Sequence, residues 1–325
     1  MGKIRVLITG VTGFVASHLV DFLIDKNVQI YGTKRRRSPI GNIKHVKDKI
    51  NFVGCELRDF LSVKKAIGGS RPDIIFHLAA QSFVPAGISQ PQNTFEVNAM
   101  GTLNLLEAVR LSNLNPIIHV ASTADVYGLI NSNKDIITEE SLPKPLNLYA
   151  VSKLSAEYLA IQYSHSYGIK SIISRILTHT GPRRGHAFVE SSFAKQIAEI
   201  EAGIKEPTIT VGNLKSIRTF LDVRDAVRAY WLLVNKCKLG ECYNICGDTT
   251  MSINELLDTL LSFSSLKDKI KIKVDKKLFR PTDPIMPKID KSKFVKSTGW
   301  KPEIDINKTL KDLLDFWREK VKGGE

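Results

Sequence analysis

The sequence has few cysteines and no long apolar run, and both shortages limit what the protein can be. Its four cysteines, Cys55, Cys237, Cys242 and Cys246, follow the spacing of neither a metal site nor a disulfide framework, so we expect reduced thiols and no metal. Because no stretch of about 18 consecutive apolar residues occurs, we expect no membrane span. An apolar strand pattern begins at Ile4, which leaves no room for a signal peptide. Together these absences favour a cytoplasmic protein.

Acidic residues are outnumbered by basic ones, 33 against 47, which gives a formal net charge of +14. The basic residues are spread along the chain with acidic ones between them, and no nucleic-acid recognition motif accompanies them. We therefore expect no nucleic-acid partner. A charge of this sign also suits small polyanionic ligands such as a dinucleotide.

The first half of the chain alternates short apolar runs with helical patterns. Strands are expected over residues 3–9, 28–33, 50–54, 73–77, 116–121 and 170–174, and helices over 13–25, 60–67, 94–111 and 149–167. This order is typical of a doubly wound, Rossmann-type α/β fold with a parallel sheet. Such sheets bind ligands at the carboxyl ends of their strands, so functional residues are expected there.

A glycine-rich loop, Gly10-Val11-Thr12-Gly13-Phe14-Val15-Ala16, joins the first strand to the first helix. Its first glycine permits a tight turn, its second lets the backbone approach a pyrophosphate, and Ala16 allows the helix to pack closely on the strand. This context predicts a dinucleotide site rather than an incidental turn. The residues expected to contact the cofactor here are Gly10, Thr12, Gly13, Phe14 and Val15.

The end of the second strand contains no acidic residue, although an NAD enzyme usually places one there to bind the ribose. The segment reads Lys34-Arg35-Arg36-Arg37 instead, and guanidinium groups bind phosphate through two donors at once. We therefore expect NADP rather than NAD, with Arg35 and Arg36 on the 2′-phosphate. A solvated basic loop is the alternative. The next strand ends are expected to border the same cofactor through Glu56, Leu57, Leu78, Ala79 and Ala80.

The second half is less regular and is expected to form a smaller C-terminal, substrate-binding lobe. Helices are expected over 189–203, 222–235, 252–263 and 305–319, and strands over 208–211 and 241–245. We divide the chain into a dinucleotide-binding domain, residues 1–175 with about 215–250, and a lobe of residues 176–214 and 251–325.

Tyr149 and Lys153 are four residues apart, on one face of an expected helix. A lysine ammonium favours the ionised form of a nearby phenol, so the pKa of Tyr149 is expected to fall toward working pH. Beside a bound nicotinamide, a tyrosinate can take a hydroxyl proton while the attached carbon gives up hydride. The spacing alone fits a surface pair on a helix equally well.

Taken together, these motifs resemble those of the extended short-chain dehydrogenase/reductase family, over nearly the whole chain. Within that family, residues 80–84, 121–128 and 179–185 resemble the GDP-mannose 4,6-dehydratases, and residues 193–197, 211–214, 218–225 and 280–283 look equally like the GDP-4-keto-6-deoxymannose reductases. The motifs that carry the resemblance are the Gly10 loop, His77-Leu78-Ala79-Ala80, Asn98 before Gly101-Thr102, Ala121-Ser122-Thr123, and Tyr149 with Lys153.

The resemblance implies roles for individual residues. Asp125 stands where the dehydratases usually carry glutamate, and Thr178 where they usually carry asparagine. Arg218 and Arg280 are expected on the substrate diphosphate, because planar guanidinium forks suit phosphate oxygens, although surface salt bridges are the alternative. The implied catalytic residues are Thr123, Asp125, Tyr149 and Lys153. Those implied near NADP are Gln81, His179 and Arg184, and the substrate contacts are Ser82, Thr123, Thr178, Val189, Lys195, Asn213, Arg218 and Arg280.

The reaction that the resemblance implies is 4,6-dehydration of a GDP-hexose, such as GDP-mannose or a GDP-N-acetylhexosamine. Asp125 would remove the C5 proton and protonate the departing C6 hydroxyl, which requires a pKa raised by partial burial. A GDP-4-keto-6-deoxy-sugar reductase or a 4-epimerase using NAD(P)H, and a non-catalytic NADP-sensing protein, are the alternatives. The family also implies a homodimer or homotetramer.

Overall fold

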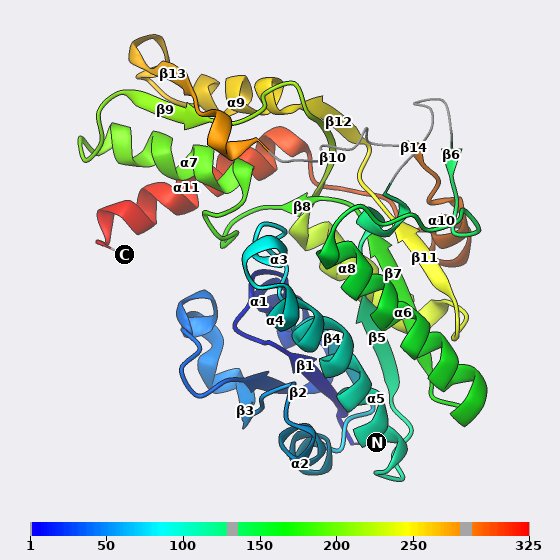
Figure 1. Ribbon diagram of the computed structural model, residues 1–325. Helices are drawn as coiled ribbons and strands as arrows, with labels where there is room; N and C mark the ends of the chain where they lie inside the picture. Colours follow the sequence, from blue (N-terminus) through cyan, green and yellow to red (C-terminus); the bar gives the residue numbers. More distant parts are fainter. Residues whose placement is uncertain (1, 129–135, 280–287, 325) are drawn as a thin grey trace.

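The central element of the fold is a seven-stranded sheet in the order β11-β7-β5-β4-β1-β2-β3. The computed structural model describes residues 2–128, 136–279 and 288–324. Every pairing in this sheet is parallel, and helices cover both of its faces (Figure 1), so the expected doubly wound fold is confirmed. The strands are β1 (Ile4–Thr9), β2 (Val28–Lys34), β3 (Ile50–Gly54), β4 (Ile74–His77), β5 (Ile117–Ala121), β7 (Ser171–Ile176) and β11 (Cys242–Ile245).

The strand order reverses between β1 and β4, because the chain runs outward through β2 and β3 before it returns to β4. Thr9 lies opposite His77 at the carboxyl ends of these two strands. Open α/β sheets bind ligands in the crevice outside such a switch point. The glycine loop and residues 78–81 both leave the sheet here, so the two segments start side by side.

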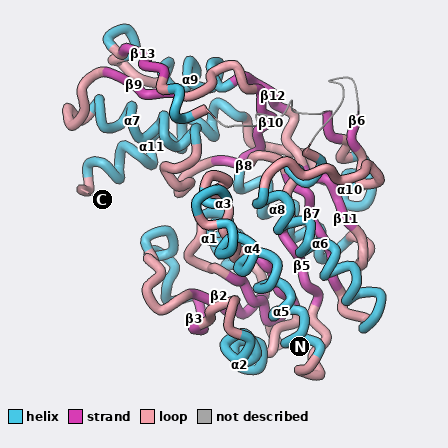
Figure 2. Tube along the Cα trace, viewed as in Figure 1, coloured by secondary structure: helices cyan, strands magenta, loops and turns pink. Residues whose placement is uncertain are grey.

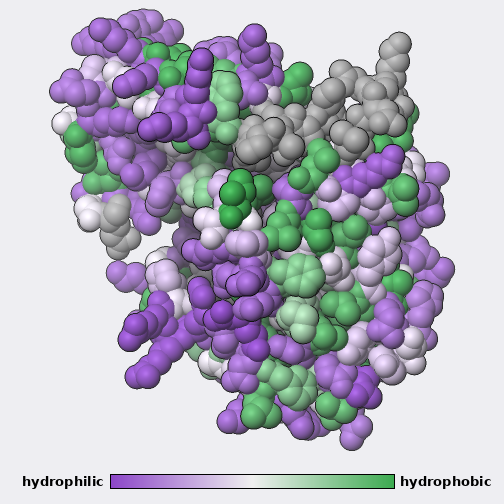
Figure 3. All heavy atoms as spheres, in the orientation of Figure 1, coloured by the Kyte–Doolittle hydropathy of each residue, from purple (hydrophilic) through white to green (hydrophobic). Residues whose placement is uncertain are grey.

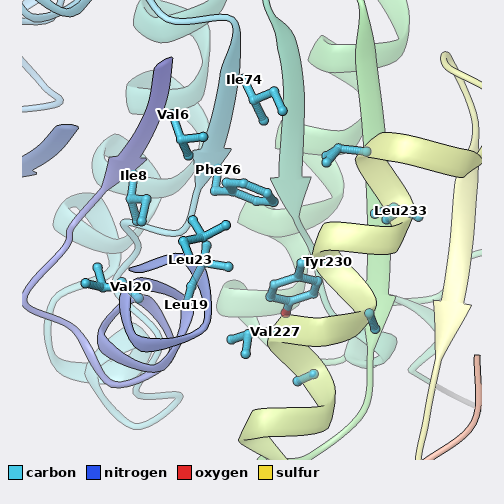
Figure 4. Packing of buried hydrophobic residues seen from close by; sticks show 14 of the residues in the cluster. Val6, Ile8, Leu19, Val20, Leu23, Ile74, Phe76, Val227, Tyr230 and Leu233 are labelled. Atoms are coloured by element: carbon cyan, nitrogen blue, oxygen red, sulfur yellow. The ribbon is translucent and has the colours of Figure 1, made fainter. Parts of the chain in front are cut away.

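Helices pack on the sheet through two separate apolar cores, one on each face. In the first core, Ile8 and Phe76 of the sheet pack with Leu19 and Leu23 of α1 and with Tyr230 of α8 (Figure 4). Each of these five side chains is at most 1% exposed, so α1 is held firmly behind the glycine loop. The helices of the first face are α1 (Phe14–Ile24) and α8 (Val223–Lys236), and those of the second are α2 (Phe60–Ser70), α5 (Gly101–Arg110) and α6 (Leu148–Tyr167).

The helix expected over 94–111 is interrupted by a π-turn. It consists of α4 (Pro91–Phe95), the π-helix η2 (Glu96–Met100) and α5. Within η2 the Asn98 side chain points into the protein and bonds to the loop after β4, which explains the extra residue in this turn. The periodicity of apolar residues in the sequence does not reveal such a local insertion.

The second lobe is built mainly from three helices (Figure 2), α7 (Val189–Glu201), α9 (Ile253–Ser262) and α11 (Ile306–Lys322). Their apolar faces share a third core that includes Phe193, Leu257, Leu314 and Trp317. Short strands flank it: β9 (Thr208–Val211) pairs with β13 (Lys271–Val274), and β10 (Ile217–Asp222) lies between β8 (His179–Thr180) and β12 (Thr249–Ser252).

Helix α10 (Ser292–Thr298), which the expected division assigns to the second lobe, packs instead beside α8 and β11. Its Phe294 enters the first core with Trp300. No helix in the described ranges is long and apolar enough to cross a membrane. The remaining short elements are α3 (Ala86–Ser89), η1 (Gly41–Lys49), η3 (Ala124–Tyr127), β6 (Ile136–Ile137), η4 (Lys267–Lys269), η5 (Lys276–Leu278) and β14 (Lys288–Ile289).

Candidate active site

The glycine loop forms a tight turn that only glycine fills comfortably. Gly10 has a φ of +66°, and a Cβ there would lie 3.0 Å from both the Cα and the Cβ of Ala79. The Gly13 amide donates to the Gly10 carbonyl at 2.9 Å, and the Gly10 amide donates to the Thr33 hydroxyl at 3.1 Å. Helix α1 begins after Gly13 with no side chain capping its first amides. These amides and the bare loop suit a pyrophosphate, so the residues present fit a dinucleotide.

The segment after β2 is basic and open. Arg35 and Arg36 are both exposed, and Arg35 acts electrostatically on the Glu56 carboxylate. Glu56 is half-buried and accepts from the Arg58 guanidinium at 3.2 Å. The neighbouring Leu57 side chain packs into the second core at 7% exposure, so it lines the protein interior rather than the surface.

A chain of buried hydrogen bonds fixes the loop after β4. The Thr9 hydroxyl accepts the Leu78 and Ala79 amides at 3.0 Å each and therefore donates its own proton to His77 Nδ1, at 2.9 Å. His77 Nε2 then donates to Thr102, at 3.1 Å. Burial lowers the pKa of His77 to about 3, which keeps this ring neutral.

Asn98 links the same loop to α6. Its side chain accepts the Gln81 amide at 2.7 Å and donates to the Gln81 carbonyl and to the Ser152 hydroxyl, at 3.0 and 2.9 Å. Ser152 in turn donates to the Tyr149 carbonyl at 2.7 Å. The loop expected beside the phosphates and the helix of Tyr149 are thus tied through one buried amide. Ala80 is half-buried in this loop, and Ser82 is exposed.

Tyr149, Thr123 and Asp125 meet at the carboxyl edge of the sheet. Thr123 follows β5, and α6 begins at Leu148 after the Asn147 side chain accepts the Ala150 amide at 2.8 Å. A hydrogen bond joins the Tyr149 hydroxyl to Thr123, and the Asp125 carboxylate acts on the same phenol. The Thr123 hydroxyl also accepts the Asp125 amide at 3.2 Å, which starts the short helix η3.

The expected fall in the pKa of Tyr149 is wrong. Loss of water around the half-buried ring raises the pKa of this phenol, and Asp125 adds to the rise, whereas Arg184 and the Thr123 hydrogen bond act against it. Burial also lowers the pKa of Lys153 to about 8, opposed by Glu157. Desolvation of both groups therefore outweighs the attraction inferred from their spacing.

Asp125 does not meet the expected partial burial, because its side chain is exposed. The reason is local: the other three residues of η3 are buried in a small apolar cluster, and Asp125 is the one residue of this short helix that faces outward. It nevertheless stays within electrostatic reach of Tyr149.

A cation that acts on the phenol, Arg184, belongs to a cluster of aromatic rings. The His179 ring stacks on Phe14 with a centroid separation of 6.1 Å and an interplanar angle of 5°. The Arg184 guanidinium lies 3.6 Å from the Phe188 ring centroid and 5.1 Å from that of Phe14. Arg184 Nε is also 3.2 Å from the Glu190 carboxylate, yet neither atom has a hydrogen-bond partner within the described residues. Burial lowers the pKa of Arg184, so a half-buried cation lies over Phe14, the first residue of α1.

The loop that carries Arg184 is fastened to α1. Arg183 has a φ of +70°, and its Nη2 donates to His18 Nδ1 and to Asp21, each at 2.6 Å. His18 Nε2 donates to the Pro182 carbonyl at 2.8 Å, and burial lowers the pKa of His18 to about 4. These hydrogen bonds hold residues 181–185 against α1.

The residues expected to bind substrate are more scattered. Val189 begins α7 and packs against the third core, and Lys195 pairs along the same helix with Glu199 at 2.7 Å. Asn213 accepts the Lys215 amide at 3.0 Å, and Arg218 on β10 donates to the Ile217 carbonyl at 2.8 Å. Arg280 lies outside the described residues. Thr178 is half-buried next to His179, and its carbonyl accepts the Leu221 amide at 3.0 Å.

Three buried residues behind the site carry no role in the sequence-based interpretation: Ser122, Glu157 and Arg175. Glu157 accepts hydrogen bonds from both of the others. The sequence contains one signal for this cluster: Arg175 lies inside an apolar strand, and an arginine there requires a buried partner.

Known proteins resemble this chain in sequence and in overall fold. A family described as GDP-mannose 4,6 dehydratase matches residues 7–313. GDP-6-deoxy-D-mannose reductase of Pseudomonas aeruginosa is 32% identical over 268 residues, which cover 82% of this chain and 82% of that protein. GDP-mannose 4,6-dehydratase of Yersinia enterocolitica is 31% identical over 317 residues, which cover 86% of this chain and 84% of the relative. The solved structure of RMD from Pseudomonas aeruginosa complexed with NADPH has a TM-score of 0.81 and 29% identity, covering 98% of this chain and 100% of that one. The chain therefore belongs to the GDP-mannose 4,6-dehydratase family, within the extended short-chain dehydrogenases/reductases.

Proposed function

We propose that the chain is an NADP-dependent GDP-sugar 4,6-dehydratase, acting on a GDP-hexose such as GDP-mannose or a GDP-N-acetylhexosamine. The observation that carries the proposal is the Asp125 carboxylate beside Tyr149 and Thr123. Oxidation or reduction at C4 needs the phenol and the threonine alone, whereas elimination across C5 and C6 needs a second acid–base group. Asp125 is exposed, so it is accessible to a substrate.

The cofactor would be held by the glycine loop, the uncapped first turn of α1 and the loop after β4. Arg35 and Arg36 support NADP over NAD, because both are exposed cations and no carboxylate ends β2. The relative whose solved structure contains NADPH gives the same indication. A bound oxidised nicotinamide supplies a positive charge, a hydride acceptor and then a hydride donor, so that the overall loss of water consumes no reductant.

In the first half-reaction, Tyr149 takes the O4 proton of the sugar while C4 is oxidised. Thr123 bonds the same oxygen and holds it in line. Arg184 and the Thr123 hydrogen bond favour the phenolate against the effect of burial. Lys153 is buried one turn after Tyr149 on the same helix, and we assign its ammonium to the stabilisation of negative charge on the phenol oxygen.

In the second half-reaction, the C4 ketone makes the C5 proton acidic and Asp125 removes it. The same proton passes from Asp125 to the C6 hydroxyl, which leaves as water. A proton from solvent is then added at C5, which completes the reduction at C6. Overall, C4 is oxidised, C6 is reduced and one water is lost. Substrate covering the exposed Asp125 would supply the burial that this double role requires. We assign Arg218 and Arg280 to the substrate diphosphate. The other residues assigned to substrate contacts are Ser82, Thr178, Val189, Lys195 and Asn213.

One comparison favours a second candidate, a GDP-4-keto-6-deoxy-sugar reductase, because a relative 32% identical is named GDP-6-deoxy-D-mannose reductase. This reaction uses Tyr149 as the proton donor to O4, and the raised pKa of the phenol suits it. It needs no base at C5.

Mass spectrometry separates the two candidates. The chain is incubated with NADP⁺ and no reductant, in separate reactions with GDP-mannose and with GDP-N-acetylhexosamines. Loss of one water from one of these sugars supports the dehydratase. If every sugar keeps its mass while NADPH is oxidised in the presence of a GDP-4-keto-6-deoxy sugar, the chain is the reductase.

We also propose a homodimer or homotetramer in a reducing, cytoplasmic setting. Hydrophobic residues gather over α4 and α6 on one face of the molecule (Figure 3), and Met100, Val151 and Tyr158 are 43%, 37% and 55% exposed. Apolar side chains in such numbers on neighbouring helices suit contact with a second copy. The four cysteines are free thiols, which suits the reducing setting.

A further inference from the structure

A carboxylate with no access to solvent lies directly behind the proposed catalytic groups. Glu157 is 0% exposed and lies on α6, one turn after Lys153. Ser122, the residue before Thr123, donates a short hydrogen bond to Glu157 Oε1. A single carboxylate therefore joins the end of β5, which carries Thr123, to the helix that carries Tyr149 and Lys153.

Arg175 on β7 holds this carboxylate in one orientation. Its Nη2 and Nε donate to Glu157 Oε2 at 2.8 and 3.0 Å, a two-pronged contact between side chains that are 6% and 1% exposed. Its Nη1 donates to the Tyr127 hydroxyl and to the Glu139 carbonyl, both at 3.1 Å. Tyr127 donates onward to Asn244 on β11 at 2.7 Å. The Arg175 guanidinium thus donates hydrogen bonds to Glu157, Tyr127 and Glu139, so the Arg175–Glu157 pair cannot reorient without breaking several of them.

Buried ion pairs give little net stability, because removing two charges from water costs about as much as their attraction returns. A pair of this kind is better explained by a geometric or electrostatic task than by stability. Both tasks are visible here: Glu157 touches the strand end that carries one proposed catalytic group and shares a helix with two more.

We propose that Glu157, clamped by Arg175, is a positioning residue: through Ser122 it fixes Thr123 against α6, and it places a carboxylate one turn behind the Lys153 ammonium. The catalytic part of this inference rests on the proposed function. The electrostatic part concerns the fold alone and can be measured without any substrate.

The groups around Lys153 support the electrostatic part. Lys153 interacts with His77 on β4 and His119 on β5, and burial lowers the pKa of each ring to about 3, so both are neutral. Burial also lowers the pKa of Lys153 to about 8, and Glu157 is the group that acts in the opposite direction. Glu157 itself faces Arg175 on β7 and the Cys242 thiol on β11, whose pKa is raised to about 12, first by burial and then by Glu157.

The direct test measures the pKa of Lys153 by NMR of the chain labelled with ¹³C at the lysine ε-carbons. The signal is assigned by its loss in Lys153→Met. Glu157→Gln is expected to lower this pKa by about one unit, the low end of the range for the loss of an opposite charge nearby. Glu107→Gln is the matched control, since Glu107 bonds to Arg110 and Tyr163 on the outer side of α5 and α6. It should leave the Lys153 signal unchanged.

Glu157→Gln leaves Arg175 buried and unpaired, which can prevent folding. The double variant Glu157→Gln/Arg175→Met removes both charges and keeps the expected lowering of the Lys153 pKa. A Lys153 pKa equal to that of the wild type in the double variant overturns the electrostatic part, whether or not the chain turns over any sugar.

Ser122→Ala tests the positioning part, because it keeps the Glu157 charge and removes one contact. It should leave the pKa of Lys153 unchanged and lower kcat roughly tenfold with KM unaffected, the equivalent of one lost hydrogen bond. An unchanged kcat, measured on a substrate that the wild type converts, overturns the positioning part. If the wild type converts no GDP-sugar, the proposed function fails and the NMR result stands alone.

Discussion

Replacing Lys153 with methionine is expected to stabilise the protein at neutral pH while destroying its activity. Lys153 is 6% exposed, and burial lowers its pKa from 10.5 to about 8. At pH 7 the folded chain therefore buries a charged ammonium, which lowers the free energy of unfolding. One pKa unit corresponds to 1.36 kcal/mol, so this cost is about 3 kcal/mol. Methionine has a similar length and no charge, so the substitution removes this energetic cost.

The pH dependence follows from the same shift. Below about pH 8 the folded and unfolded chains both carry the proton, and the full cost is present. Between about pH 8 and 10.5 the unfolded chain binds more protons at this position than the folded one, so the free energy of unfolding rises with pH. Above that window the amine is neutral in both states and the cost is gone.

Urea unfolding of the wild type and of Lys153→Met between pH 6 and about pH 10.5 tests this reasoning. The variant should be more stable by about 3 kcal/mol at pH 7, and the difference should shrink to near zero at the top of the range. Lys64→Met, at an exposed position on α2, is the control and should show no such convergence. A variant less stable than the wild type at pH 7, or a difference that does not change with pH, would refute the argument.

Four further changes test the site. Gly10→Ala combines a φ of +66° with a Cβ 3.0 Å from Ala79, so NADPH affinity should fall at least about tenfold in a fluorescence titration; an unchanged affinity would mean that the cofactor lies elsewhere. Tyr149→Phe should lower kcat by about 100-fold or more with NADPH affinity retained, and persistent turnover would remove Tyr149 from the mechanism. Asp125→Asn should stop the loss of water to a similar degree, whereas a reductase would tolerate it. Arg36→Ser should weaken NADP binding by roughly tenfold or more and leave NAD binding unaltered, and equal losses for both would argue against a 2′-phosphate contact.

The elements of the sheet and of its covering helices were predictable because their signal is local. Parallel strands buried on both faces read as continuous apolar runs, and the strand expected over 73–77 corresponds to β4 (Ile74–His77), which is buried along its whole length. The glycine loop was equally clear, since a strand and a helix flank it. The strand β10 (Ile217–Asp222) was missed, because its polar and apolar residues resemble a loop until β8 and β12 pair with it.

The electrostatics of the site could not be predicted from spacing. Tyr149 and Lys153 do share a helix, but the pKa of each depends on the water that the surrounding fold removes. Asp125 is exposed because the neighbouring residues of η3 take the buried side of this short helix, which a motif does not encode. The Arg175–Glu157 pair forms between a strand and a helix whose approach is set by the packing of the sheet.

The proposed dehydratase activity requires Asp125 and Tyr149 to act together in removing water from a GDP-sugar. The most direct measurement incubates the wild type in D₂O with NADP⁺ and GDP-mannose or a GDP-N-acetylhexosamine, with no reductant, and follows the sugar by mass spectrometry and NMR. The account predicts a product that has lost one water and carries one deuterium at C5. A sugar recovered with its original mass and protons, from a preparation that binds NADP⁺ and oxidises NADPH with a 4-keto-6-deoxy sugar, would contradict it.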